Sequence, residues 1–208
     1  MATTQKDTKV ITGDVRLVFP ELFTPKAFEE GDDPTYSVRI LISKSDVKTV
    51  KAIERAKKAA LAQGKEKLFS GKLPRNFQEK ELIDGDVYNQ ELIDDGEEPR
   101  PELEGHYFMN VNAKSAPGVV KPVGKDENGK TKFDPITDES EIYSGVYARV
   151  SMNWYCYDGK KSKGVTAGLN NVVKIMDGDY LGGRSSAASD FADEDFDIGD
   201  LDDDEDLI

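Results

Sequence analysis

The chain has very little imidazole or thiol, because its 208 residues include one histidine, His106, and one cysteine, Cys156. One cysteine cannot form an intrachain disulfide, and metal sites built from His and Cys ligands are almost excluded. No apolar run approaches the roughly 20 residues of a membrane span, and no charged segment with an apolar core precedes Val10. We therefore expect no cofactor, no membrane association and a reducing, cytoplasmic compartment.

Negative charge is concentrated at the C-terminus. Residues 190–208, DFADEDFDIGDLDDDEDLI, contain eleven carboxylates and no basic side chain, which leaves 30 acidic against 28 basic residues in the rest of the chain. A body so close to neutrality can carry a basic face, so the overall acidity does not exclude a polyanionic partner. We expect one domain over residues 1–183 and a disordered acidic tail over residues 184–208.

The hydrophobic pattern is mainly that of β-strands. Apolar and polar residues alternate in several segments, as in half-buried strands. In the first segment, Ile11, Val15, Leu17 and Phe19 are expected to face inward. The predicted strands are residues 10–19, 34–43, 105–114, 142–159 and 165–176.

A single helix is predicted over residues 45–64, with Ser45 as its cap and Gly64 as its end. The lysines and arginine along one side of this helix are better explained as a solvated face than as a phosphate-binding ridge. Residues 64–104 contain a near-repeat, ELIDGD and ELIDDG, and read as a long, partly irregular insertion. The aspartates there lack EF-hand spacing, and residues 118–125 lack the spacing of a phosphate loop, so neither calcium nor nucleotide binding is expected.

The strand over residues 142–159 carries the most informative pattern. One face holds Val146, Ala148, Val150, Met152, Trp154 and Cys156, and the opposite face holds Tyr143, Tyr147, Arg149, Asn153, Tyr155 and Tyr157. The first set predicts a core, whereas the second can stack bases and neutralise phosphates. The strand is long, Gly145 is placed for a bend, and a turn with three lysines follows, which together favour a small closed barrel.

Outward tyrosines are common on sheets, and lysines in turns are often only solubilising, so this strand alone leaves both interpretations open. Polar and aromatic residues recur at the positions of the other strands that alternate with the core residues and so point outward. This recurrence favours a surface that binds nucleic acid by stacking and charge. The predicted DNA-binding set is Arg16, Arg39, Phe108, Asn110, Tyr147, Arg149, Asn153, Tyr155, Tyr157, Lys160, Lys161 and Lys163.

The stretches HYFMNVNAK, APGVVKPV and SGVYARVSMNWYCYDGKKSKGVTAGLNNVVKIMDGDYLGG resemble the phage single-stranded DNA-binding proteins that share an OB-fold with the replication protein of podophages. The resemblance spans residues 8–183. It implies a mainly β protein: a five-stranded Greek-key barrel with one capping α-helix, whose face and loops hold oligonucleotides. The predicted helix lies between the second and third strands, whereas an ordinary OB-fold has it between the third and fourth.

A tail of this charge resembles nucleic acid, so it is expected to occupy the basic groove until DNA displaces it. The resemblance implies that the released tail recruits DNA polymerase or helicase-primase. A purely solubilising tail is the alternative. The residues expected to bind partners are Asp202, Asp203, Asp204, Glu205, Asp206, Leu207 and Ile208.

The leading hypothesis is therefore a non-catalytic single-stranded DNA-binding protein of phage replication or recombination in the cytoplasm of an infected bacterium. A homodimer is left open. Two other functions compete with it. A metal-dependent nuclease would use the abundant Asp and Glu residues, but no spaced acidic pair with a nearby lysine marks its site. A DNA-mimicking inhibitor would spread its acidity over the fold, whereas here the acidity follows the fold.

Overall fold

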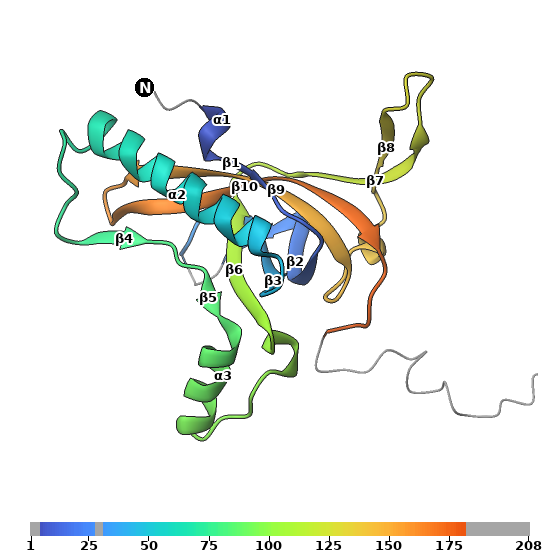
Figure 1. Ribbon diagram of the computed structural model, residues 1–208, viewed down its shortest axis with the longest axis horizontal. Helices are drawn as coiled ribbons and strands as arrows, with labels where there is room; N and C mark the ends of the chain where they lie inside the picture. The colour runs from blue at the N-terminus through green and yellow to red at the C-terminus, as the bar shows by residue number, and fades with distance from the viewer. Residues whose placement is uncertain (1–4, 28–30, 182–208) are drawn as a thin grey trace, which may run out of the picture.

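The computed structural model describes residues 5–27 and 31–181, and within this part the chain is mainly β (Figure 1). No helix in the described part is long and apolar enough to cross a membrane. The helices are α1 (Gln5–Thr8), α2 (Val47–Lys67), α3 (Gly85–Asp94) and the short 3₁₀ turns η1 (Pro101–Leu103) and η2 (Glu139–Glu141). The strands are β1 (Lys9–Ile11), β2 (Val15–Lys26), β3 (Thr35–Ser43), β4 (Phe77–Glu79), β5 (Ile83–Asp84), β6 (His106–Ala113), β7 (Gly118–Lys125), β8 (Thr131–Pro135), β9 (Tyr147–Asp158) and β10 (Lys163–Met176).

Five of these strands close into a barrel. The order is β9-β2-β3-β6-β10, and β10 pairs again with β9 to complete the ring. The β6–β10 pairing is parallel and the other four are antiparallel. Numbered along the chain, the barrel strands follow the order 1-2-3-5-4, which is a Greek-key arrangement. The predicted OB-fold barrel is therefore confirmed.

The alternation along β9 builds the barrel interior as expected. Ala148, Val150 and Met152 are fully buried and Trp154 is almost so, while the residues between them face outward. Helix α2 lies between the second and third barrel strands, as predicted, and it closes the interior with Ile53, Ala56 and Ala60. The long strand therefore presents one apolar face to the core and leaves the other for the surface.

Helix α2 begins and ends slightly later than the sequence predicts. Asp46 rather than Ser45 caps it, by accepting a hydrogen bond from the Thr49 backbone N–H at 3.0 Å. Gly64 does not end the helix but lies within it, because a Cβ at this position would collide with the side chain of Cys156 on β9. This glycine is required for close packing of the helix against the barrel rather than for a turn.

The prediction of one continuous strand over residues 10–19 is wrong. The chain bends at Gly13, whose backbone N–H donates to Thr49 Oγ1 at 2.7 Å, and pairing resumes in β2. The bend shifts the alternation, so Ile11 is exposed although it was expected in the core. Phe19, also expected inside, is 58% exposed and has a φ of 49°, in the left-handed region. Sequence alternation could not reveal this because it assumes an unbroken strand.

Two further elements differ from the prediction of a single helix and irregular connections. The insertion contains helix α3, which Asp84 caps by accepting from the backbone N–H groups of Asp86 and Val87. The segment after β6 forms the β7–β8 hairpin, which stands away from the barrel (Figure 1). Ten residues of helix and a largely exposed ribbon give only weak periodic signals, so neither was predicted.

The anchoring of α3 predicts a specific dependence on pH. Hydrogen bonds from Lys44 Nζ, at 2.5 Å to Asp84 and 2.7 Å to Asp86, hold the pKa of both carboxyl groups below the ordinary value. A lowered pKa stabilises the folded state above the unfolded pKa, and this contribution is lost as the pH falls through the folded pKa. Wild type should therefore exceed Lys44→Met in free energy of unfolding at pH 5, and the difference should shrink toward pH 2 in urea titrations. A difference that stays constant over this range would contradict the argument.

Candidate nucleic-acid interface

The centre of the site is a groove on the outer face of β3 and β6. Their antiparallel register places Arg39 opposite Asn110 and Ser37 opposite Asn112. All four side chains lie on the face of the sheet that points away from the core. Arg39 Nε donates to Asn110 Oδ1 at 3.0 Å. The groove has a volume of about 620 Å³ and is lined by Phe19, Glu21, Lys26, Ala27, Thr35, Ser37, Val38, Arg39, Lys80, Asn110 and Asn112.

Two aromatic rings hold the Arg39 guanidinium in place. Its Cζ atom lies 5.1 Å from the centroid of Phe108 and 5.8 Å from that of Phe19. Cation–π contacts of this kind fix the plane of the guanidinium. Phe19 thus contributes an exposed ring to the groove, a role that the sequence did not suggest because the ring was expected in the core.

The expectation that Phe108 presents an exposed ring is wrong. Its side chain is only 4% exposed and packs in a second small cluster with Val18, Leu41 and Leu103. Tyr88 from α3 covers it edge-on, with the ring centroids 5.4 Å apart. Phe108 does lie on the outer face of β6, as predicted, but α3 and the segment after it form a second layer over this part of the sheet. Phe108 therefore supports Arg39 from below.

Lys80 brings a second cation to the groove. Burial lowers the pKa of Lys80, and the nearby charge of Arg39 lowers it further. Burial also lowers the pKa of Arg39. Within the described residues neither side chain forms an ion pair, and the groove carboxylate Glu21 is paired with Lys26 at 2.5 Å. Two partly desolvated cations without a paired carboxylate favour an anionic ligand.

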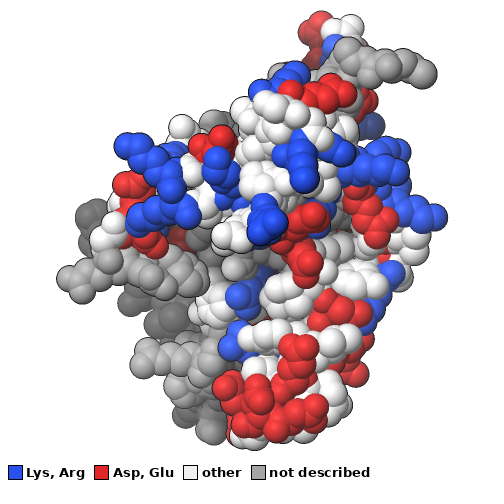
Figure 2. Space-filling model, turned by 90° about the vertical axis from the view of Figure 1, so that its left-hand side faces the viewer, with Lys and Arg blue, Asp and Glu red and all other residues white. Residues whose placement is uncertain are grey.

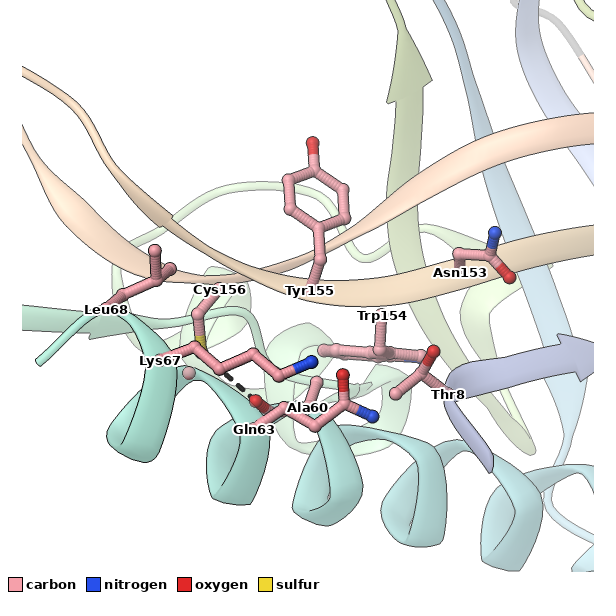
Figure 3. Close-up of a pocket in the computed structure, with 10 residues that line it drawn as sticks. Thr8, Ala60, Gln63, Lys67, Leu68, Asn153, Trp154, Tyr155 and Cys156 are labelled. Carbon is pink, nitrogen blue, oxygen red and sulfur yellow. Dashed lines mark hydrogen bonds between the residues drawn. The ribbon is translucent and has the colours of Figure 1, made fainter. Parts of the chain in front are cut away.

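The outer face of β9 continues the same surface. Asn153 pairs with Gly168 of β10, which pairs in turn with Asn112 of β6. Tyr155 is 48% exposed and points away from α2, whereas Trp154 and Cys156 point toward the helix (Figure 3). The predicted orientation of these side chains is confirmed. A Cβ at Gly168 would lie 3.0 Å from the Tyr155 ring, so this glycine leaves room for the ring to lie across β10.

The turn between β9 and β10 adds a basic pocket of about 470 Å³. Lys160, Lys161 and Lys163 line it together with Arg75 and Gln78, which come from the segment that leads into β4 and from β4 itself. Tyr157 Oη donates to Gln78 Oε1 at 3.2 Å and so attaches this segment to β9. Lys163 is paired with Asp158 at 2.7 Å. Neither Arg75 nor Lys80 was predicted, because the insertion offers no periodicity that would place them.

Three predicted residues lie toward the other end of β9 and make structural contacts. Arg16 donates from Nη2 to the Asp179 carbonyl at 2.7 Å and lies 5.2 Å from the centroid of the Tyr147 ring. Arg149 Nε donates to Asp14 at 2.6 Å. Tyr147 precedes Tyr155 by eight residues, or ~25 Å of strand. These side chains are not brought together with the groove, and the predicted tail residues lie outside the described part of the chain.

Charge is distributed unevenly over the face shown in Figure 2. Basic side chains gather over its upper part, and acidic side chains gather at the bottom, over the α3 region. The groove therefore lies on a molecule with distinct basic and acidic regions.

Within the described residues, no group of three or more His, Cys, Asp or Glu could hold a metal ion.

An OB barrel with a cationic groove on its second and third strands, bordered by the end of β2 and the turn after β9, defines the class of oligonucleotide-binding OB-folds. The family model described as "Enterobacter phage Enc34, ssDNA-binding protein" matches residues 8–207, and the chain belongs to this family. The expected resemblance to phage single-stranded DNA-binding proteins is thereby confirmed. Because the family consists of binding proteins, the non-enzymatic hypothesis is confirmed as well.

Two solved structures and one curated protein are also similar to this chain. The single-stranded DNA-binding protein of bacteriophage Enc34 in complex with ssDNA aligns with a TM-score of 0.63 and 22% identity, over 85% of this chain and 91% of that one. Another structure of the Enc34 protein aligns with a TM-score of 0.61 and 21% identity, over 90% of this chain and 92% of that one. A curated relative, "Putative protein p50" of Acyrthosiphon pisum secondary endosymbiont phage 1, is 29% identical over 192 residues, or 89% of this chain and 93% of that one.

Proposed function

We propose that this protein binds single-stranded DNA along the outer face of β3 and β6, without sequence preference. Arg39 and Lys80 contact phosphates at the centre of the path, and Lys160, Lys161 and Arg75 contact them at the β9–β10 turn. Phe19 and Tyr155 stack on bases, while Asn110 and Asn112 offer amide groups. The observation that carries the proposal is the pair of partly buried cations, Arg39 and Lys80, that have no ion-pair partner in the described chain.

The test is a fluorescence titration of labelled oligo(dT) over a series of salt concentrations. The logarithm of the association constant should fall linearly with the logarithm of the salt concentration, with a slope of about −0.7 per phosphate contacted. Duplex DNA of equal length is the comparison. Affinity that is independent of salt, or equal for duplex and single strand, would overturn the proposal.

Tyr155→Ala should weaken binding to mixed-sequence oligonucleotides about tenfold, because stacking on an aromatic side chain contributes roughly 1–3 kcal/mol per base. The control is Tyr180→Ala: Tyr180 has nearly the same exposure, 49% against 48%, but it stacks on Tyr143. The free energy of unfolding should change little in either variant. Equal loss of affinity in both variants would show that exposed tyrosines, and not this site, determine binding.

The acidic tail acts on the same groove. Its eleven carboxylates compete with DNA for Arg39 and Lys80, and the tail is exposed for other proteins once DNA has displaced it. The basic partners we propose are DNA polymerase and helicase-primase, in phage replication or recombination within the bacterial cytoplasm. Two observations support this: residues 190–208 carry eleven negative charges, and the groove contains two cations, Arg39 and Lys80, without an ion-pair partner in the described chain.

A further inference from the structure

The β7–β8 hairpin projects from the barrel as a two-stranded ribbon, which we name the arm (residues 121–135). Residues 118–120 still pair with β10, but beyond Val120 the two strands of the arm pair only with each other among the strands that the structure describes. Pro122 lies directly opposite Phe133, and Val123 and Phe133 are each 48% exposed. An isolated hairpin is only marginally stable in water, so an ordered ribbon with exposed apolar side chains indicates a surface that is covered in an assembly.

The arm is firmly held at both its base and its tip. At the base, Lys121 forms a 2.8 Å ion pair with Glu141, and the Ile136 backbone N–H donates to the Val119 carbonyl. At the tip, Asp126 Oδ1 accepts from the backbone N–H groups of Asn128 and Lys130, at 2.9 and 2.8 Å. These bonds define the turn from which Lys125, Lys130 and Lys132 project. The arm is therefore preorganised to present lysines beside an apolar side chain.

A complementary surface lies on the opposite side of the molecule, on what we name the lobe (residues 83–104). The lobe contains nine acidic residues and one basic residue, Arg100. Its exposed apolar side chains are Ile83, Val87 and Ile93. Figure 1 shows the arm and α3 at opposite corners of the molecule, and Figure 2 shows the acidic side chains gathered over the α3 region.

We propose that the arm of one copy docks on the lobe of the next copy when the two lie side by side on single-stranded DNA. The arm has a small positive excess, four lysines against three acidic residues, whereas the lobe is strongly acidic, and both carry exposed apolar side chains. Their placement at opposite corners prevents the arm of one copy from docking on its own lobe. A contact between two different surfaces need not close into a ring and generates an open array, which suits a linear strand. This inference rests on the proposed function, since DNA supplies the high local concentration that a small contact requires.

The experiment compares two association constants, one for an oligo(dT) long enough for a single copy and one for poly(dT), with the single-site length taken from a length series. For wild type, poly(dT) should be preferred per site. Arm reversal, Lys125→Glu with Lys130→Glu and Lys132→Glu, should lower this preference about tenfold while leaving single-site affinity within about twofold. Lobe reversal, Glu91→Lys with Glu97→Lys and Glu98→Lys, should do the same.

The two reversals combined in one chain should restore most of the preference, because the opposite charges then face each other again. A misfolded variant could not produce that recovery. Phe133→Ser tests the apolar part and should also lower the preference. The matched control reverses three exposed lysines of α2 outside both surfaces, Lys48→Glu, Lys51→Glu and Lys58→Glu, and should leave the preference unchanged.

Several results would overturn the inference. A wild type that shows no preference for poly(dT) would do so. An arm reversal that weakens single-site binding as strongly as poly(dT) binding would assign the arm to DNA. If the lobe reversal had no effect on the preference, the lobe would not be the surface on which the arm docks. If wild type failed to bind even the single-site oligonucleotide, the proposed function itself would fail, and this outcome is distinct from a loss of preference alone.

Discussion

Replacing Arg39 and Lys80 together with alanine should lower the affinity for single-stranded DNA about 100-fold at 0.1 M salt. Each side chain is partly desolvated in the groove, and hydrogen bonds to charged groups contribute about 1.5–3 kcal/mol each. The slope of affinity against salt should also become shallower by about 1.4, because two phosphate contacts are lost. Oligo(dT) titrations at four or more salt concentrations measure both quantities.

The matched control is Arg55→Ala with Lys58→Ala, which removes one arginine and one lysine from exposed positions of α2. This variant should bind within about threefold of wild type, because non-specific charge alone contributes little at this salt concentration. Arg39→Lys separates charge from geometry, since lysine keeps the charge but cannot lie flat between Phe19 and Phe108. If the double alanine variant lost affinity with an unchanged salt slope, the loss would come from altered packing rather than from phosphate contacts.

Removing residues 190–208 should raise the affinity for single-stranded DNA about tenfold at 50 mM salt, and the gain should fade toward 0.5 M as ions screen the tail. The same deletion should abolish binding to a basic partner protein such as the replicative polymerase. A chain in which Asn and Gln replace the eleven carboxylates is the control for length, and it should behave like the deletion.

A double-mutant cycle tests whether the tail and DNA share the groove. In the background of Arg39→Ala with Lys80→Ala, the deletion should raise DNA affinity by much less, since the cations for which the tail competes are absent. An undiminished gain would show that the tail acts through the net charge of the molecule. A deletion that left DNA affinity unchanged in the wild-type background would contradict competition altogether.

The two faces of β9 could be predicted from its alternating residues, because successive side chains of a regular strand point to opposite faces. Val150, Met152 and Trp154 therefore entered the core, and Tyr155 remained outside. The same rule failed at Ile11 and Phe19, because the bend at Gly13 depends on a contact with Thr49, 36 residues away. The alternation of apolar and polar residues along a segment carries no information about a contact with a residue so far away in the chain.

The candidate site shows the same division. Arg39 and Asn110 could be predicted, since each lies on the outer parity of a regular strand. Lys80 and Arg75 could not, because both lie in the irregular insertion. The pairing of β4 with β10 brings Lys80 to the groove and Arg75 to the basic pocket at the β9–β10 turn. The burial of Phe108 was equally hidden, since it results from a layer contributed by α3.

The sequence by itself determined the properties that depend on neighbouring residues: the two faces of the long strand, the position of α2 between the second and third barrel strands, and the concentration of negative charge in residues 190–208. Only the tertiary structure decided which outward side chains share a groove, which are covered, and which are used in structural contacts. The physical reason is that burial and electrostatic environment are set by segments far apart in the chain, which come together only when the barrel closes through the pairing of β9 with β10.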